Sequence, residues 1–166
     1  DPMFRRRTRL HALVLAECLE DRGRFLDAIV DTVWAIAEES SWTVPAHQGA
    51  QKAKVGLPDI DEPIVDLFSA QTAHSFAWTL YLLGDRLDKV SPVGRPRMAR
   101  ELDRRVLTPY LAREDFGWMG FGQRAGRPNN WNPWINSNVL AAALLVEPAD
   151  ARRVETVFKV LRSLDK

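Results

Sequence analysis

The spacing of apolar residues predicts helices along almost the whole chain. Apolar positions recur at intervals of three or four from Leu10 to Leu19 and again from Phe25 to Ala37, as on the buried face of a helix. Arg22-Gly23-Arg24 separates the two stripes, so they predict a helical hairpin with a short turn. No run shows the strict apolar and polar alternation of a hairpin strand, so few strands are expected.

The same periodicity predicts four more helices in two further pairs. Their expected ranges are about 64–83, 91–111, 136 or 137 to 146, and 148–164. Gly84 is the expected stop of the third helix. Ser91 can cap the fourth, with Pro92 at its first position.

Two long segments lack this periodicity. Ser40–Pro63 is rich in Pro and Gly, and Asp115–Pro133 is rich in Gly, Trp and Asn. Irregular segments of this length are uncommon unless they are functional. Because they follow the second and fourth helices, they could emerge on the same side of the molecule.

The pattern therefore predicts an all-α fold of three consecutive helical hairpins, with residues 1–166 forming one domain. A helix pair that recurs about every 50 residues is typical of a solenoid or of a closed ring of hairpins. Six helices would be only part of such a ring. We therefore expect a fragment with exposed apolar flanks, through which copies of the chain could associate as a homo-oligomer.

Composition and charge exclude several classes of function. Lys and Arg total 23 against 22 Asp and Glu, which gives no general attraction to nucleic acid or to an anionic membrane. The longest apolar run, Val139–Val146, is far shorter than the ~20 residues of a membrane span. No signal peptide is recognisable, so a cytoplasmic and a periplasmic location both stay open.

Cofactor and metal patterns are also missing from the sequence. The single Cys excludes an internal disulfide and a cysteine-based zinc site. Phosphate-binding and dinucleotide-binding Gly patterns are absent. The acidic residues between Asp59 and Asp66 depart from the calcium-loop spacing and are interrupted by proline, which favours a solvated loop. We predict neither cofactor nor metal.

The densest candidate chemistry lies in residues 129–138, which hold five Asn and two Trp. Carboxamides donate and accept hydrogen bonds, as sugar hydroxyls and carboxylates require, and an indole offers an apolar face to a pyranose ring. Upstream, Trp118 could add a second platform, and Arg124 and Arg127 could grip a carboxylate or sulfate. The segment predicts binding of an acidic sugar. In the alternative reading, its Asn residues cap and turn the chain while its Trp residues fill the core.

Asn129-Asn130-Trp131-Asn132-Pro133-Trp134 resembles the toroid-domain signature of the heparinase II/III-like family and its alginate-lyase relatives, which read Asn-Asn-His-Gly-x-Trp there. The resemblance continues through residues 38–47, 57–59, 66–68 and 162–166, and so covers nearly the whole chain. It implies an incomplete (α/α) toroid followed by β-sandwich domains. It also implies cleavage of uronate-containing polysaccharide by β-elimination.

This reaction requires a group that neutralises the uronate carboxylate, a base for the proton at C5 and an acid, often Tyr, for the leaving oxygen. The resemblance assigns the first role to Asn130. The family His that follows is Trp131 here, which is then a sugar platform or a packing residue. The family Tyr would lie beyond Lys166, and both Tyr81 and Tyr110 fall within predicted helices.

His47 is the best available base, because it lies in the first long loop and imidazole titrates near neutrality. The predicted catalytic residues are thus Asn130 and His47. The predicted substrate-binding residues are Trp42, Trp118, Arg124, Arg127, Asn129, Trp131, Asn132 and Trp134.

These residues favour part of a polysaccharide lyase that acts on a heparin-like, heparan-like or alginate-like polymer, with the isolated chain inactive. The alternative is a non-catalytic helical-repeat module that binds acidic glycans or a protein partner. A hydrolase of unsaturated uronates ranks third, because it needs acidic residues that the Asn-rich segment does not offer.

Overall fold

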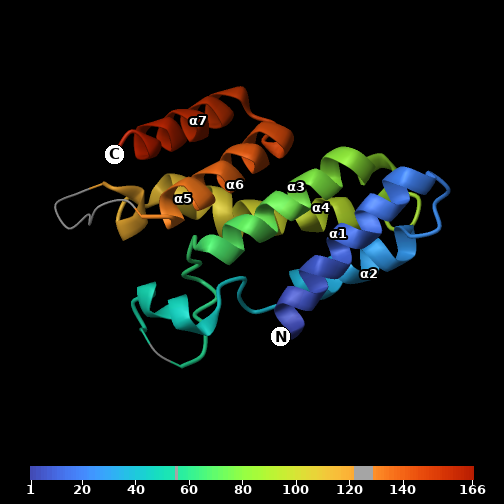
Figure 1. The fold of residues 1–166 in the computed structure, drawn as a ribbon, viewed down its shortest axis with the longest axis horizontal. Coiled ribbons are helices and arrows are strands. Elements are labelled where there is room, and N and C mark those ends of the chain that lie inside the picture. The colour runs from blue at the N-terminus through green and yellow to red at the C-terminus, as the bar shows by residue number, and fades with distance from the viewer. Residues whose placement is uncertain (55, 122–128) are drawn as a thin grey trace.

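The computed structural model describes residues 1–54, 56–121 and 129–166, and these residues are helical with no strand among them (Figure 1). The all-α prediction is confirmed for this part of the chain. The α-helices are α1 (Pro2–Glu20), α2 (Leu26–Ala37), α3 (Leu67–Leu87), α4 (Gly94–Leu102), α5 (Thr108–Ala112), α6 (Trp131–Val146) and α7 (Asp150–Leu164). Short helical turns are η1 (Pro45–Ala50), η2 (Asp103–Leu107) and η3 (Gly117–Met119).

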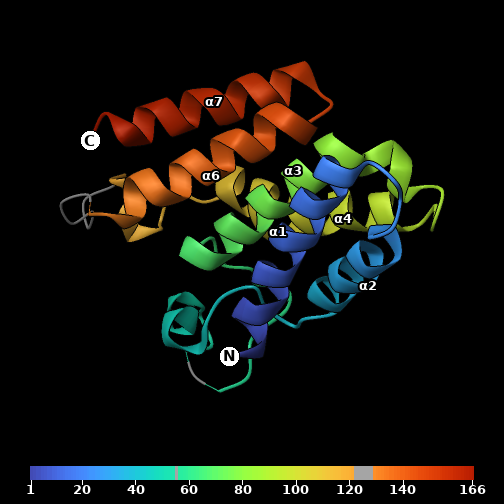
Figure 2. The ribbon, with the colours of Figure 1, turned by 45° about the vertical axis from the view of Figure 1, so that its right-hand side comes forward.

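The helices form two layers of alternating direction. Following the chain in Figures 1 and 2, α1, α3 and α6 run one way, and α2, the α4–α5 run and α7 return. α3 is the central helix, since it packs against α1, α2, α4 and α6. The hairpins α1–α2 and α6–α7 therefore lie on either side of α3.

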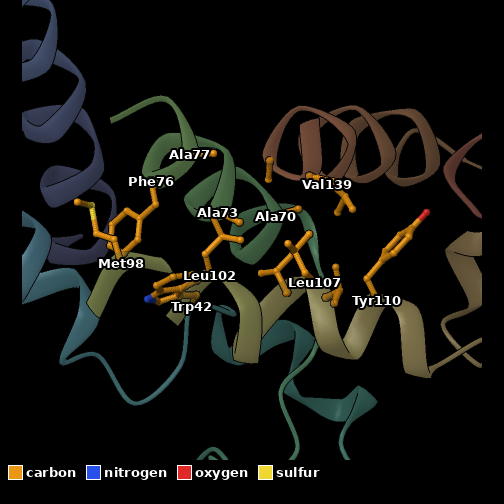
Figure 3. Packing of buried hydrophobic residues seen from close by; sticks show 14 of the residues in the cluster. Trp42, Ala70, Ala73, Phe76, Ala77, Met98, Leu102, Leu107, Tyr110 and Val139 are labelled. Carbon is orange, nitrogen blue, oxygen red and sulfur yellow. The ribbon is translucent and has the colours of Figure 1, made fainter. Parts of the chain in front are cut away.

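The core lies between these layers and is built on the small residues of α3 (Figure 3). Ala70, Ala73 and Ala77 are fully buried and let neighbouring helices approach closely. Larger side chains fill the space between them. Trp42, for example, packs edge-on against Phe76 with ring centroids 5.1 Å apart.

Asp66 starts α3. Its Oδ1 atom accepts hydrogen bonds from the backbone N–H groups of Phe68 and Ser69, and its own N–H donates to the Ser69 hydroxyl. This reciprocal capping box places the beginning of the helix at Leu67.

The prediction that Gly84 ends the third helix is wrong. α3 continues to Leu87, and Gly84 is buried inside it. A Cβ atom at position 84 would lie 3.3 Å from the Arg95 side chain, so the missing side chain of glycine leaves room for α4 to pack closely. Arg95 pairs there with the carboxylates of Asp85 and Asp88, at 2.8 and 2.5 Å.

The expected fourth helix is present in three pieces and begins at Gly94, not at Ser91. The Ser91 N–H donates to the Leu87 carbonyl and so extends the end of α3 instead of capping α4. The π-helical turn η2 joins α4 to α5. Pro109, which has no N–H for the carbonyl of residue 105, is the second residue after this turn.

α6 begins five residues earlier than position 136. The Asn129 side-chain oxygen accepts the Trp131 N–H at 2.9 Å, and its backbone carbonyl accepts the Asn132 N–H. Pro133 in the first turn is compatible with a helix start, because N–H groups there need no helical acceptor. Most of the Asn-rich segment is therefore helical.

A buried polar network ties α6 to its neighbours. The Asn136 side-chain oxygen accepts the Tyr110 hydroxyl at 2.7 Å, and its nitrogen donates to the Ser163 hydroxyl at 2.9 Å. Asn132 donates to the carbonyls of Trp118 and Ser163. These bonds fix α6 against α5, α7 and the segment around η3.

We expect Asn136→Ala to lower the free energy of unfolding by about 2–3 kcal/mol, because it leaves buried partners without hydrogen bonds. Urea denaturation measures the change. The double variant Asn136→Ala with Tyr110→Phe should lose less free energy of unfolding than the two single variants added together, because both changes remove the same Tyr110–Asn136 hydrogen bond. The exposed neighbour Ser137→Ala is the control, expected to stay within ~0.5 kcal/mol. Strict additivity would contradict the described bond.

Candidate functional site

The two long irregular segments meet at one pocket, beside the first turns of α3 and α6. It has a volume of about 710 Å³ and is lined by η1, residues 64–65, residues 113 and 115–118, and Asn129 and Trp131. We call it the loop pocket. Of the predicted site residues, it brings together His47, Trp118, Asn129 and Trp131.

His47 is held by a buried carboxylate. Its Nδ1 atom lies 2.7 Å from Oδ2 of Asp66, whose side chain is fully buried. Because a carboxylate can only accept a hydrogen bond, Nδ1 carries a proton, and in the neutral imidazole the lone pair lies on Nε2. The imidazole also stacks on Phe68, with ring centroids 5.7 Å apart, and contacts Trp131 at 4.4 Å. His47 is thus oriented as a general base would be.

Asn129 and Trp131 also line the pocket, and Trp131 lies beside His47. The Asn129 oxygen is engaged with the Trp131 N–H, which anchors this carboxamide at the pocket. Asn130, next to it, is exposed and makes no capping hydrogen bond to α6. It lies outside the pocket lining, so Asn129 is the carboxamide placed to meet a ligand there.

Trp118 forms a largely buried wall of the loop pocket. Its indole N–H donates to the Val65 carbonyl at 3.0 Å, and its ring stacks on Phe116 and Tyr110. Because the ring faces are used in these contacts, Trp118 shapes the pocket more than it offers a free platform.

The pocket also holds an arginine that is already paired. Arg113 binds both oxygens of Asp115, at 2.8 and 2.9 Å, and its guanidinium lies over the Phe116 ring. The hydrogen bonds from Arg113 lower the pKa of the Asp115 carboxyl, and those to Asp115 raise the pKa of Arg113. A ligand carboxylate would have to compete with Asp115 for this cation.

Three predicted site residues lie elsewhere in the fold. Trp42 is 2% exposed in the core, where its indole N–H donates to the Ile36 carbonyl. The Asn132 amide is buried in the α6–α7 network, as the capping and packing alternative would have it. Trp134 projects from α6 into a different hollow, next to α1 and α3. Arg124 and Arg127 fall outside the described residues.

Neither tyrosine lies at the loop pocket. The Tyr110 hydroxyl is buried against Asn136, and burial raises its pKa. Tyr81 is exposed beside Trp78 on α3, with ring centroids 5.9 Å apart. The described residues therefore supply the pocket with a candidate base and with no phenolic acid.

Sequence reasoning missed Asp66, Arg113 and Asp115. The order Asp66-Leu67-Phe68-Ser69 before an apolar run is a capping signal and could have located the start of α3. It could not have shown that the same carboxylate reaches His47, nineteen residues away.

No protein-family model matches the chain, and no curated protein matches it. None of the described helices has the length and apolar character to cross a bilayer. Nor do three His, Cys, Asp or Glu side chains among the described residues gather as a metal site would require.

We predict that Asp66→Asn switches the proton of neutral His47 from Nδ1 to Nε2. The asparagine oxygen can still cap α3, but its NH2 group donates to Nδ1 where the carboxylate accepted. Nitrogen NMR of the imidazole reports the tautomer, and thermal unfolding checks that the fold persists. An unchanged tautomer in a folded variant would refute the assignment of Asp66 as the orienting group.

Proposed function

We propose that the loop pocket binds a uronate unit of an acidic polysaccharide, and that this chain is part of a polysaccharide lyase that acts by β-elimination. The observation that carries the proposal is the His47–Asp66 pair in a pocket shared with Asn129 and Trp131. The resemblance of the Asn-rich segment to heparinase II/III-like proteins supports the same class of substrate.

His47 would perform the first step. Its Nε2 lone pair would take the proton from C5 of the uronate, and the imidazolium that forms would be stabilised by the buried Asp66 carboxylate. The phenyl and indole rings on either side fix the imidazole, so little reorientation precedes the transfer.

A carboxamide would stabilise the charge that develops on the uronate carboxylate. Amide N–H donors serve this role because the charge grows in the transition state. The family motif points to Asn130 and the pocket geometry to Asn129. The positive end of the α6 dipole lies at the same place and favours an anion.

The elimination also needs an acid for the leaving oxygen, and the two tyrosines lie away from the pocket. We therefore propose that the acid comes from outside these residues and that the chain alone does not turn over substrate. The layers α1–α3–α6 and α2–α4–α5–α7 would then be the two helical walls of part of an (α/α) toroid.

The second candidate is a non-catalytic helical-repeat module that binds acidic glycans or a protein partner. It is favoured by the phenol-free pocket and by an exposed apolar stripe on α7, formed by Val154, Phe158 and Leu161. In that case the pocket would bind uronate without proton transfer.

Two assays separate these functions. Tryptophan fluorescence measures binding of oligouronates to this chain, and ultraviolet absorbance of the unsaturated product measures cleavage of heparan, alginate, chondroitin and hyaluronan. Cleavage is assayed in this chain and in a polypeptide that continues beyond Lys166. We expect binding in both and cleavage only in the longer one.

In the longer polypeptide, His47→Gln should lower turnover by about 10²–10⁴-fold, as expected for loss of a general base. The His47→Gln change should alter the dissociation constant for oligouronates little. His74→Gln, an imidazole outside the loop pocket, is the matched control and should keep activity. Separate Asn129→Ala and Asn130→Ala variants identify the carboxylate partner. Binding without cleavage in every form would support the glycan-binding module, and absence of both would refute the lyase and the glycan-binding module alike.

Asp115→Asn should tighten oligouronate binding by about threefold, because it leaves Arg113 with only its longer 3.4 Å contact to Glu62 and removes a like charge from the pocket. Calorimetric titration at low salt measures the gain, and added salt should reduce it. Asp27→Asn makes the same change of charge on an exposed position of α2. Equal gains in the two variants would show that only net charge matters.

A further inference from the structure

A second hollow crosses the layer formed by α1, α3 and α6. Its lining residues come from α1, α3 and α6, and Figure 2 shows α3 lying between the other two helices. Its volume is about 600 Å³, and its lining includes Leu15 of α1, Trp78 and Leu82 of α3, and Trp134 of α6. We call it the apolar groove.

The groove differs from the loop pocket in charge. Its twelve lining residues, all in the described part of the chain, include no Asp, Glu, Lys or Arg. The loop pocket holds Arg113 and Asp115. A charged ligand would lose hydration in the groove without gaining a partner.

Several polar groups at the groove already bond one another. The Trp78 indole N–H donates to Nε2 of His74 at 2.5 Å, and His74 also bonds the Asn138 side chain. Asn138 in turn donates to the Trp134 carbonyl at 2.7 Å. Across from them, His11 and Ser75 lie 2.6 Å apart.

Burial favours the neutral form of both imidazoles. Desolvation lowers the pKa of His74 and that of His11, and His74 lowers the pKa of His11 further. Because these imidazole, indole and carboxamide groups bond one another, a ligand need not supply hydrogen bonds to them.

Large apolar side chains are left exposed at the groove. Trp78 is 42% and Trp134 44% exposed, and Leu15 and Leu82 are exposed beside them. Indole faces pair well with other aromatic rings, and the volume is within the usual range for small-molecule sites.

We propose that the apolar groove is a second ligand site, which binds an uncharged aromatic compound against Trp78 and Trp134. The site is independent of the uronate function of the loop pocket. Three features of the groove indicate this class of ligand: its lining carries no charged side chain, two indole rings are exposed there, and several of its polar side chains bond one another.

The only cysteine of the chain is a built-in reporter. Cys18 lines the groove and is exposed, so a bound ligand should shield its thiol from alkylation. The probe is phenylnaphthylamine, an uncharged dye whose fluorescence rises in an apolar site. We expect saturable binding to the full chain, together with slower reaction of Cys18 with N-ethylmaleimide.

Variants locate the dye. Trp134→Ala and Leu15→Glu, both at exposed positions, should each weaken dye binding by about tenfold, the first through lost aromatic contact and the second through an introduced charge. Phe158→Ala removes a more exposed aromatic ring, which lies on α7 outside the groove, and should leave binding unchanged. Circular dichroism verifies the helical fold of each variant.

Three results would overturn the proposal: no saturable binding, equal loss of affinity in Phe158→Ala, or unprotected Cys18 at dye saturation. Displacement of the dye by oligouronate would also overturn it, because the ligand would then be acidic. His47→Gln should bind the dye normally whatever becomes of its activity, so failure of the uronate function and failure of this site are distinguishable.

Discussion

One buried carboxylate, that of Asp66, connects the fold to the candidate chemistry. A carboxylate out of water is costly unless hydrogen bonds surround it, and Asp66 finds them in two backbone N–H groups of α3 and in His47. The same carboxylate therefore caps the start of α3 and orients the His47 imidazole. Because Phe68 belongs to the first turn of α3 and stacks on His47, the position of that turn also sets one wall of the loop pocket.

The helical architecture could be predicted from the sequence because it depends on local periodicity. The structure brings described parts of the two unpatterned segments to one pocket, although α6 already begins at Trp131, inside the second segment. The errors in helix boundaries have two causes, a tertiary contact at α3 and an unrecognised local hydrogen bond at α6. Gly84 continues α3 because Arg95 approaches it, and the side chain of Asn129, not residue 136, sets the start of α6.

The candidate site was predicted in part, and helix geometry explains the division. Once α6 begins at Trp131, residues 132 and 136 are one turn apart and point inward to Ser163. Trp131 faces His47, whereas Trp134 and Asn138 face α1 and α3. A stretch that reads as one sugar-binding motif thus serves the core, the loop pocket and the apolar groove. Asp66 and the Arg113–Asp115 pair depend on tertiary contacts that periodicity does not encode.

The two ends of α3 are stabilised by different forces, and this gives the molecule an uneven response to ionic strength. At Gly84 the approach of α4 is bridged by Arg95 with Asp85 and Asp88, all near solvent, where dissolved salt weakens attraction. At Asp66 the bonds are buried and largely shielded from ions. Rising salt should loosen the α3–α4 turn first and leave the His47 end ordered. Backbone amides near the C-terminal end of α3 would then exchange faster with solvent, while those near its N-terminal end would keep their protection.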